Sequence, residues 1–149
     1  MPMSPTQLTM REMNKEMILE YPKFEELKGE VIVNIENKNN EELVFTTSNG
    51  DIYTLYHEQD CCESVTIDDI CGDIDDVIGA PILVAEEVKL ENNVNPNGIT
   101  AINNEGSFTW TFYKLDTIKG GITIRWYGES NGYYSESVSF CRVLPTDAY

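Results

Sequence analysis

The fold of this chain is decided by the segment ITIRWYGESNGYYSESV, which spans residues 122–138. Apolar and polar side chains alternate through its first half, which is the pattern of a strand that buries one face. Asn131-Gly132 follows, and an Asn-Gly pair between two strand-like segments is a strong signal for a two-residue hairpin turn. We therefore expect two antiparallel strands that are joined at Asn131-Gly132.

This turn gives the two faces of the hairpin different characters. It would place Arg125 opposite Val138 and Tyr127 opposite Glu136, with Tyr134 on the same face. The opposite face carries the apolar side chains Ile122, Ile124 and Trp126. We expect the apolar face to form the core and the polar face to carry any binding site.

The strand pattern continues on both sides of this segment. The last third of the chain predicts a three-stranded meander over residues 107–115, 121–128 and 133–143. A second meander is predicted over residues 30–36, 43–47 and 52–57, with a hairpin turn at Asn49-Gly50 that pairs Leu43 with Tyr56. Further strands are expected near residues 65–67 and over 82–88, and residues 90–106 read as a loop.

Two segments favour helix. Residues 7–27 place apolar groups at helical spacing, and residues 68–78 follow a capping Asp68 and end at Gly79. The fold class expected is therefore α+β: a mainly antiparallel sheet of two β-meanders, with an N-terminal helix and a short acidic helix. We expect residues 1–23 to be a helical segment and residues 24–149 to form one domain.

The last meander holds the candidate ligand-binding residues, and its polar face carries Arg125, Tyr127, Tyr134 and Glu136. Arg125 offers a planar fork for phosphate or carboxylate, and aromatic rings can stack on a base or fill a partner's pocket. The candidate set is Phe108, Trp110, Arg125, Tyr127, Asn131, Tyr133, Tyr134, Ser135 and Glu136. The alternative is that Arg125 and Glu136 form a cross-strand ion pair on an ordinary sheet surface.

A second group of reactive side chains follows the first meander. His57, Asp60, Cys61 and Cys62 are candidate metal ligands, because zinc binds imidazole, thiolate and carboxylate. His57 with Cys61 or Cys62 could instead form a nucleophilic pair, although the surrounding acidic residues disfavour a thiolate. Neighbouring strand residues point to opposite faces, so at most one of Cys61 and Cys62 could join His57 in one site. Free cysteines are often buried, and cysteines of cytoplasmic proteins are normally thiols, so we expect structural roles for them.

Composition limits the classes of partner. The 149 residues are 41% hydrophobic, as in a globular domain, and carry a formal net charge of −16. Direct binding to nucleic acid or to an anionic membrane is disfavoured, because both depend on Lys and Arg. No apolar stretch has spanning length and no signal-peptide core is evident, so we expect a cytoplasmic location.

Several blocks of the chain resemble one family of uncharacterised proteins from phages and bacterial prophages. The matching blocks are residues 56–65, 69–81, 109–114 and 123–138. The family is a domain of unknown function, so the resemblance implies no reaction and no cofactor. It does imply a small accessory protein that acts in the host cytoplasm on a host system.

Two hypotheses about function remain open. The first is a non-enzymatic binder that interferes with a host system, for example a defence system. It would either sequester a small nucleotide signal or dock on a host protein. The alternative is a metal- or cysteine-dependent enzyme that uses His57 with Cys61 or Cys62. A homodimer or a higher homo-oligomer is a further expectation, formed by pairing through a strand edge near residues 31–35.

Overall fold

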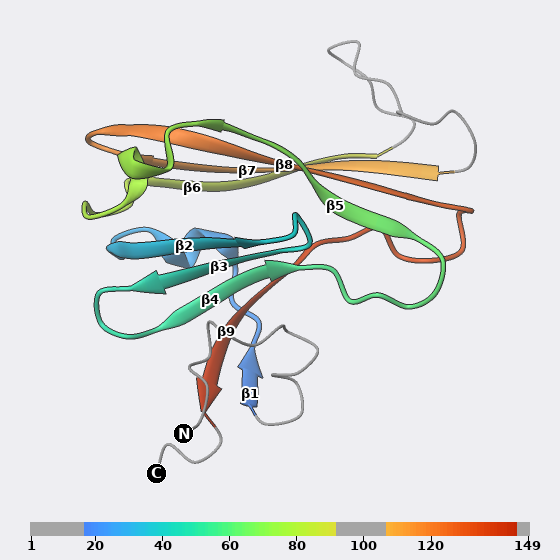
Figure 1. Cartoon of the computed structure of the whole chain (residues 1–149), viewed down its shortest axis with the longest axis horizontal. Coiled ribbons are helices and arrows are strands. Elements are labelled where there is room, and N and C mark those ends of the chain that lie inside the picture. Colours follow the sequence, from blue (N-terminus) through green and yellow to red (C-terminus); the bar gives the residue numbers. More distant parts are fainter. Residues whose placement is uncertain (1–16, 92–106, 146–149) are drawn as a thin grey trace.

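The alternating segments form strands in the computed structural model, which describes residues 17–91 and 107–145. These strands build two antiparallel sheets that lie face to face (Figure 1). One sheet contains, in order, β1 (Met17–Glu20), β9 (Ser139–Pro145), β4 (Ile52–Tyr56), β3 (Glu42–Thr47) and β2 (Ile32–Lys38). The other contains, in order, β5 (Ser64–Gly72), β8 (Gly120–Ser130), β7 (Ser107–Thr117) and β6 (Val84–Glu91).

Buried side chains from both sheets fill the space between them. Trp126 and Ile124 of β8 are fully buried and Ile122 nearly so, which confirms the core face expected from the sequence. Phe24 links the two layers, because its ring lies 4.8 Å from that of Tyr113 in one sheet and 5.2 Å from that of Phe140 in the other. Burial of apolar area between the sheets is the main source of stability.

The expected α+β class is wrong, because the regular elements of the described residues are nine strands and two short 3-10 turns. β1 occupies residues 17–20 of the expected helix 7–27, and η2 (Phe24–Leu27) is a single 3-10 turn. Residues 7–16 of that helix lie outside the described residues. β1 pairs with β9, so its backbone groups are satisfied in a sheet ladder, and this pairing overrides the local helical spacing.

The expected acidic helix over residues 68–78 is also wrong. Strand β5 continues to Gly72, and only η3 (Ile74–Val77) forms a 3-10 turn. The capping residue is Asp73, whose Oδ1 accepts a hydrogen bond from Asp75 N at 3.0 Å. The β-branched residues of β5 bury their side chains against β8, which a short exposed helix could not do.

The expected third strand of the last meander lies in the opposite sheet. After β8, residues 131–138 cross from the four-stranded to the five-stranded sheet, where β9 pairs with β4 and β1 (Figure 1). The expected pairing of Arg125 with Val138 and of Tyr127 with Glu136 is therefore wrong. Strand β5 takes the place beside β8, since it supplies apolar side chains to the core, whereas residues 133–137 are polar.

The hairpin of β3 and β4, which was expected to turn at Asn49-Gly50, forms with a register shifted by one residue from the expected one. Leu43 pairs with Leu55, so the turn contains three residues instead of two. Thr47 N donates to Asp51 O at 2.9 Å, and Gly50 has a φ of 91°. Three-residue hairpin loops place glycine in this left-handed conformation, which explains the shift.

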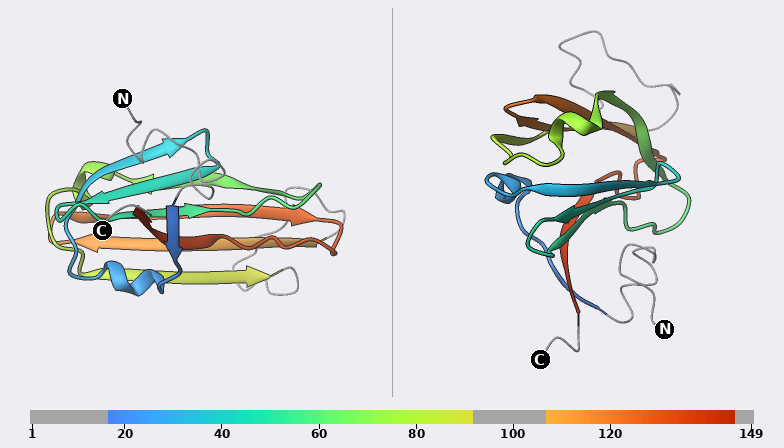
Figure 2. Two further views of the ribbon diagram at one scale, coloured as in Figure 1. Left: turned by 90° about the horizontal axis from the view of Figure 1, so that it is seen from below. Right: turned by 60° about the vertical axis from the view of Figure 1, so that its left-hand side comes forward.

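Strand β2 is one edge of the five-stranded sheet, and the homodimer expected near this edge stays a prediction. Figure 2 shows the two layers from other directions and shows the β1–β9 ladder leading away from the sandwich. Within residues 17–91 and 107–145, no helix has the length and apolar character needed to cross a membrane.

Candidate functional site

Arg125 lies on the outer face of the four-stranded sheet, in the middle of β8. Its Nε and Nη2 donate to Oδ2 of Asp68 at 2.8 and 2.5 Å, and its guanidinium lies 5.2 Å from the centre of the Trp110 ring. Asp68 reaches Arg125 because the β5–β8 ladder shifts register at this point, as in a β-bulge. The carboxylate partner of Arg125 is therefore Asp68 and not Glu136.

Aromatic rings surround Arg125 on the same face. The ring of Trp110 lies 4.6 Å from that of Tyr127 and 6.5 Å from that of Phe112, and the rings of Phe108 and Tyr127 are 6.4 Å apart. Trp110 and Tyr127 are buried, whereas Phe108 and Phe112 are half-buried. Val88 lies opposite Phe112 on β6 and is 49% exposed. We name the set Val88, Phe108, Trp110, Phe112, Arg125 and Tyr127 the aromatic face.

Acidic side chains border the aromatic face. The strand registers place Asp69 opposite Arg125, Glu86 opposite Lys114, and Glu129 opposite Phe108, all on the outer side of the sheet. Lys114 is itself held by Asp116, with 3.6 Å between Nζ and Oδ2. The border is therefore more negative than positive, in keeping with the net charge of the chain.

The other candidate residues lie in residues 131–138, which join β8 to β9 and which we name the crossing segment. Asn131 Oδ1 accepts a hydrogen bond from Tyr133 N at 3.0 Å, and the Tyr133 ring is 82% exposed. The rings of Tyr133 and Tyr134 meet edge to face with centres 5.0 Å apart. Tyr134, Ser135 and Glu136 line a pocket on the inner side of the sheet. The structure thus divides the expected single site into two groups on opposite faces of β7 and β8.

Glu136 is the anchor of the second group. Its side chain is buried, and its two carboxylate oxygens accept hydrogen bonds from Thr109 Oγ1 at 2.8 Å and from Ser130 Oγ at 2.5 Å. Gly128 allows this close approach, because a Cβ at that position would lie 2.8 Å from Glu136 O. These contacts fix the crossing segment against the end of the four-stranded sheet.

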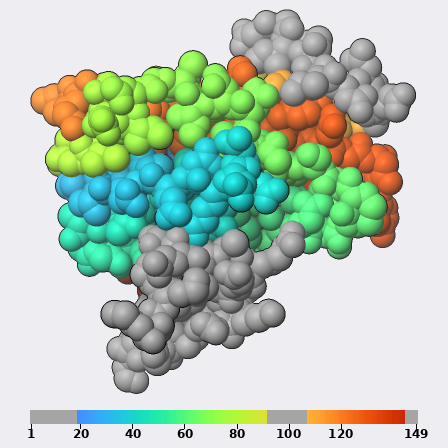
Figure 3. Space-filling model, viewed as in Figure 1, coloured from blue at the N-terminus to red at the C-terminus, as the bar shows by residue number. Residues whose placement is uncertain are grey.

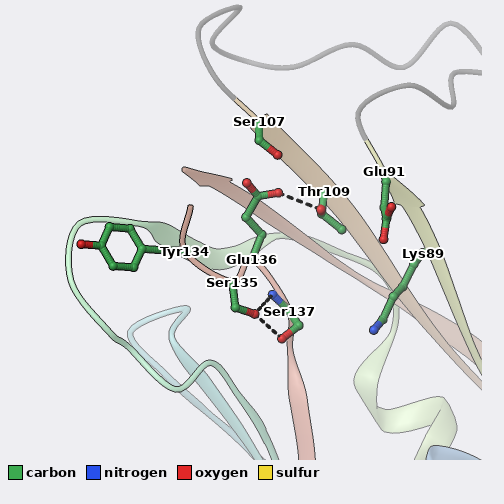
Figure 4. A pocket seen from close by; sticks show the side chains of 8 residues that line it. All are labelled: Lys89, Glu91, Ser107, Thr109, Tyr134, Ser135, Glu136 and Ser137. Atoms are coloured by element: carbon green, nitrogen blue, oxygen red, sulfur yellow. Dashed lines mark hydrogen bonds between the residues drawn. The ribbon is translucent and has the colours of Figure 1, made fainter. Parts of the chain in front are cut away.

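A polar pocket of about 290 Å³ opens beside Glu136 (Figure 4). Its lining residues are Lys89, Glu91, Ser107, Thr109, Tyr134, Ser135, Glu136 and Ser137. The hydroxyl oxygens of Ser135 and Ser137 lie 2.7 Å apart, and the Tyr134 ring points away from the other lining side chains (Figure 4). The pocket offers charged and hydroxyl groups and lacks an aromatic platform among its described residues.

His57 belongs to a separate cluster in the loop after β4. Figure 3 shows this loop beside the segment of residues 131–138, to which His57 is hydrogen-bonded at Ser137. Nδ1 of His57 donates to Ser137 O, since a carbonyl oxygen can only accept, and Nε2 is hydrogen-bonded to Glu63 Oε2, each at 2.7 Å. Both ring nitrogens are therefore engaged. Neither nitrogen is left for a metal ion or for a cysteine thiol.

Glu63 organises the loop around His57. Its carboxylate is buried and also accepts hydrogen bonds from Asp60 N at 2.8 Å and from Cys61 N at 2.9 Å. Burial alone would raise the pKa of this carboxyl, but the donors from the Cys61 backbone, His57 and the Asp60 backbone outweigh it and lower the pKa to about 2. Glu63 therefore remains ionised at neutral pH and holds the loop in place.

The cysteines differ from the expectation of four thiols. Cys61 and Cys62 are joined by a disulfide between neighbouring residues, while Cys71 is an exposed thiol and Cys141 a buried one. Burial and the nearby carboxylates of Glu42 and Glu58 raise the pKa of the Cys141 thiol to about 12. Within residues 17–91 and 107–145, no cluster of three or more His, Cys, Asp and Glu side chains could hold a metal ion.

The family of the chain follows from a family model that matches residues 25–140. The chain belongs to the DUF7448 family. DUF7448 is described as a domain of unknown function. The matched residues contain the whole four-stranded sheet, strands β2, β3 and β4 of the other sheet, and both groups of candidate residues. The comparisons with curated proteins and with solved structures found no match.

Several residues that shape these two regions of the DUF7448 domain were not predicted from the sequence. Asp68 was expected to cap a helix, so its role beside Arg125 was not foreseen. The expected strand ended at residue 88, so Lys89 was assigned to no element and Glu91 was placed in a loop. The signal for both was the alternation of charges at residues 87, 89 and 91, which places them on one face of a strand.

Proposed function

We propose that this chain is a phage-type accessory protein, a non-enzymatic binder that docks through its aromatic face on a basic surface of a host protein. The proposal assigns the action to the host cytoplasm and requires no cofactor. The observation that carries it is the position of Arg125, stacked on Trp110 amid aromatic rings and bordered by acidic side chains.

The composition of the aromatic face supports docking on a protein. Trp, Tyr, Phe and Arg are enriched in the centres of protein interfaces, where a few of them supply most of the binding free energy. Val88, which is 49% exposed on the edge strand β6, and the half-buried Phe112 beside it on β7 add accessible apolar surface. Asp69, Glu86 and Glu129 would meet basic groups on the partner, and the net charge of −16 would steer its approach.

The nucleotide form of the binding hypothesis has less support. Phosphate recognition needs free positive groups, yet Arg125 is already held by Asp68. The pocket on the other side of the sheet has one ammonium group, from Lys89, and two carboxylates. The enzyme alternative is also less supported, because both ring nitrogens of His57 are engaged.

Two matched substitutions test the docking proposal. Val88 and Val33 are 49% and 48% exposed, and lie on edge strands of different sheets. Val88→Lys puts a long cation into the aromatic face, whereas Val33→Lys makes the same change to charge and size elsewhere. Both should fold, because exposed valines contribute little to the core.

The assay is capture of partners from host lysate, followed by titration of the captured protein. We expect Val33→Lys to bind like the original chain and Val88→Lys to bind at least about 30-fold more weakly, as for loss of an interface hot spot. Raised salt should weaken binding by screening the acidic border. Equal binding by the two variants would contradict docking through the aromatic face.

A further inference from the structure

Strand β6 presents one positive and one negative side chain, Lys89 and Glu91, to the pocket beside Glu136. Lys89 and Glu91 lie two residues apart on the same strand face, which corresponds to about 7 Å along the strand. Both side chains are exposed, and neither makes a hydrogen bond or an ion pair with any residue in the described ranges. An ammonium and a carboxylate are therefore presented side by side without neutralising each other.

The carboxylate end of the pocket is built from two strands and the crossing segment. Glu91 pairs in register with Thr109, and the Thr109 hydroxyl donates to Glu136 at 2.8 Å. The carboxylates of Glu91 and Glu136 therefore flank one position of β7 (Figure 4). Two carboxylates with free lone pairs at one position suit a ligand ammonium group, which donates up to three hydrogen bonds.

The opposite end of the pocket offers donors. Lys89 points toward the side of the pocket formed by Ser135 and Ser137 (Figure 4). The hydroxyl groups of the two serines are hydrogen-bonded to each other, and the Ser137 backbone N–H donates to Ser135 Oγ at 3.2 Å. An ammonium beside serine hydroxyls suits a ligand carboxylate.

We propose that this pocket binds a small zwitterion of the amino-acid class. The ligand ammonium would lie between Glu91 and Glu136, and the ligand carboxylate would lie at Lys89 and Ser137. The order of charges along β6 selects molecules that carry both groups at short separation. This site lies on the face of the sheet opposite the aromatic face, so the proposal does not rest on the proposed docking function.

The test uses matched probes that differ by one charged group. The standard amino acids are screened by thermal shift at about 10 mM, a range in which weak binding is detectable. Each amino acid that stabilises the chain is then compared by calorimetry with its amine and acid counterparts, such as ethylamine and propionate for alanine. We expect the zwitterion to bind at least about ten-fold more tightly than either counterpart, because each counterpart loses one charge-assisted contact.

Exposed substitutions keep the result independent of folding. Glu91→Gln and Lys89→Met should each weaken binding of the zwitterion by about ten-fold or more. Glu41→Gln is the control, since Glu41 is an exposed residue between β2 and β3, in the other sheet. The inference is overturned if no amino acid binds, if an amine or an acid alone binds as tightly, or if Glu91→Gln and Lys89→Met bind like the control.

Discussion

The substitution Arg125→Ala tests whether Arg125 serves docking on a partner or only the stability of the fold. Its pair with Asp68 is accessible to solvent, because the side chains are 41% and 25% exposed, and such pairs contribute about 0–1 kcal/mol to stability. Stacking on Trp110 adds about 0.5–1 kcal/mol at an exposed site. The variant should therefore lose about 0.5–2 kcal/mol of unfolding free energy, and its melting temperature should fall by about 2–8 °C.

Binding should respond more strongly than stability. Loss of an interface arginine costs about 2 kcal/mol or more, which is about a 30-fold weaker affinity for the host partner. Arg142→Ala is the matched control, because Arg142 is 35% exposed and pairs with Asp51 at 2.9 Å in the other sheet. Both variants make the chain more negative by one charge, so long-range steering of a basic partner changes equally in each. Only Arg125→Ala should reduce the affinity measured by calorimetry.

Two results would refute this reasoning. A stability loss of about 3–5 kcal/mol, measured by denaturant unfolding and matched by Asp68→Ala, would mark a buried structural pair. Unchanged affinity in a well-folded Arg125→Ala protein would remove Arg125 from the docking surface. Arg125→Lys refines the test, since it keeps the charge and loses the planar fork and most of the stacking.

Two other predictions concern the end of the sandwich around Glu63 and the cysteines. The pKa of Glu63 is lowered to about 2 from its ordinary 4.5, so its stabilisation is complete above pH 4.5 and is lost as the pH falls toward 2. Glu63→Gln should melt at a lower temperature at pH 7, and the difference from the original chain should shrink in acid; a constant difference would contradict the network. In the native chain, iodoacetamide should label Cys71 rapidly, Cys61–Cys62 only after reduction, and Cys141 only after unfolding. Fast native labelling of Cys141, detected by mass spectrometry, would show that its thiol is neither buried nor of raised pKa.

Much of the sheet structure could be predicted because it follows from side-chain alternation. The core face of β8 was predicted correctly, because Ile122, Ile124 and Trp126 lie on one side of the chain only if it is a strand. The predicted helices were wrong, because helical spacing is a local property of the sequence. β1 is instead a strand because it pairs with β9, which lies more than a hundred residues later in the chain. Strand partners are set by tertiary contacts that no short segment encodes.

The candidate site shows the same limit. The residues around Arg125 on β7 and β8 could be placed on one face, because alternation fixes their direction. Glu136 could not, since the turn at Asn131-Gly132 does not return the chain along β8 but carries it to the other sheet. Asp68 could not be assigned either, because a β-bulge breaks the alternation at that residue.

Hydroxyl-radical footprinting of the chain, free and bound to its captured host partner, tests the central claim most directly. Docking through the aromatic face predicts lower oxidation of Val88 and Phe112 in the complex. Tyr133 and Ile118, which are 82% and 85% exposed and lie outside that face, should react equally in both states. Unchanged oxidation of Val88 and Phe112, with protection at another surface of the chain, would contradict the account.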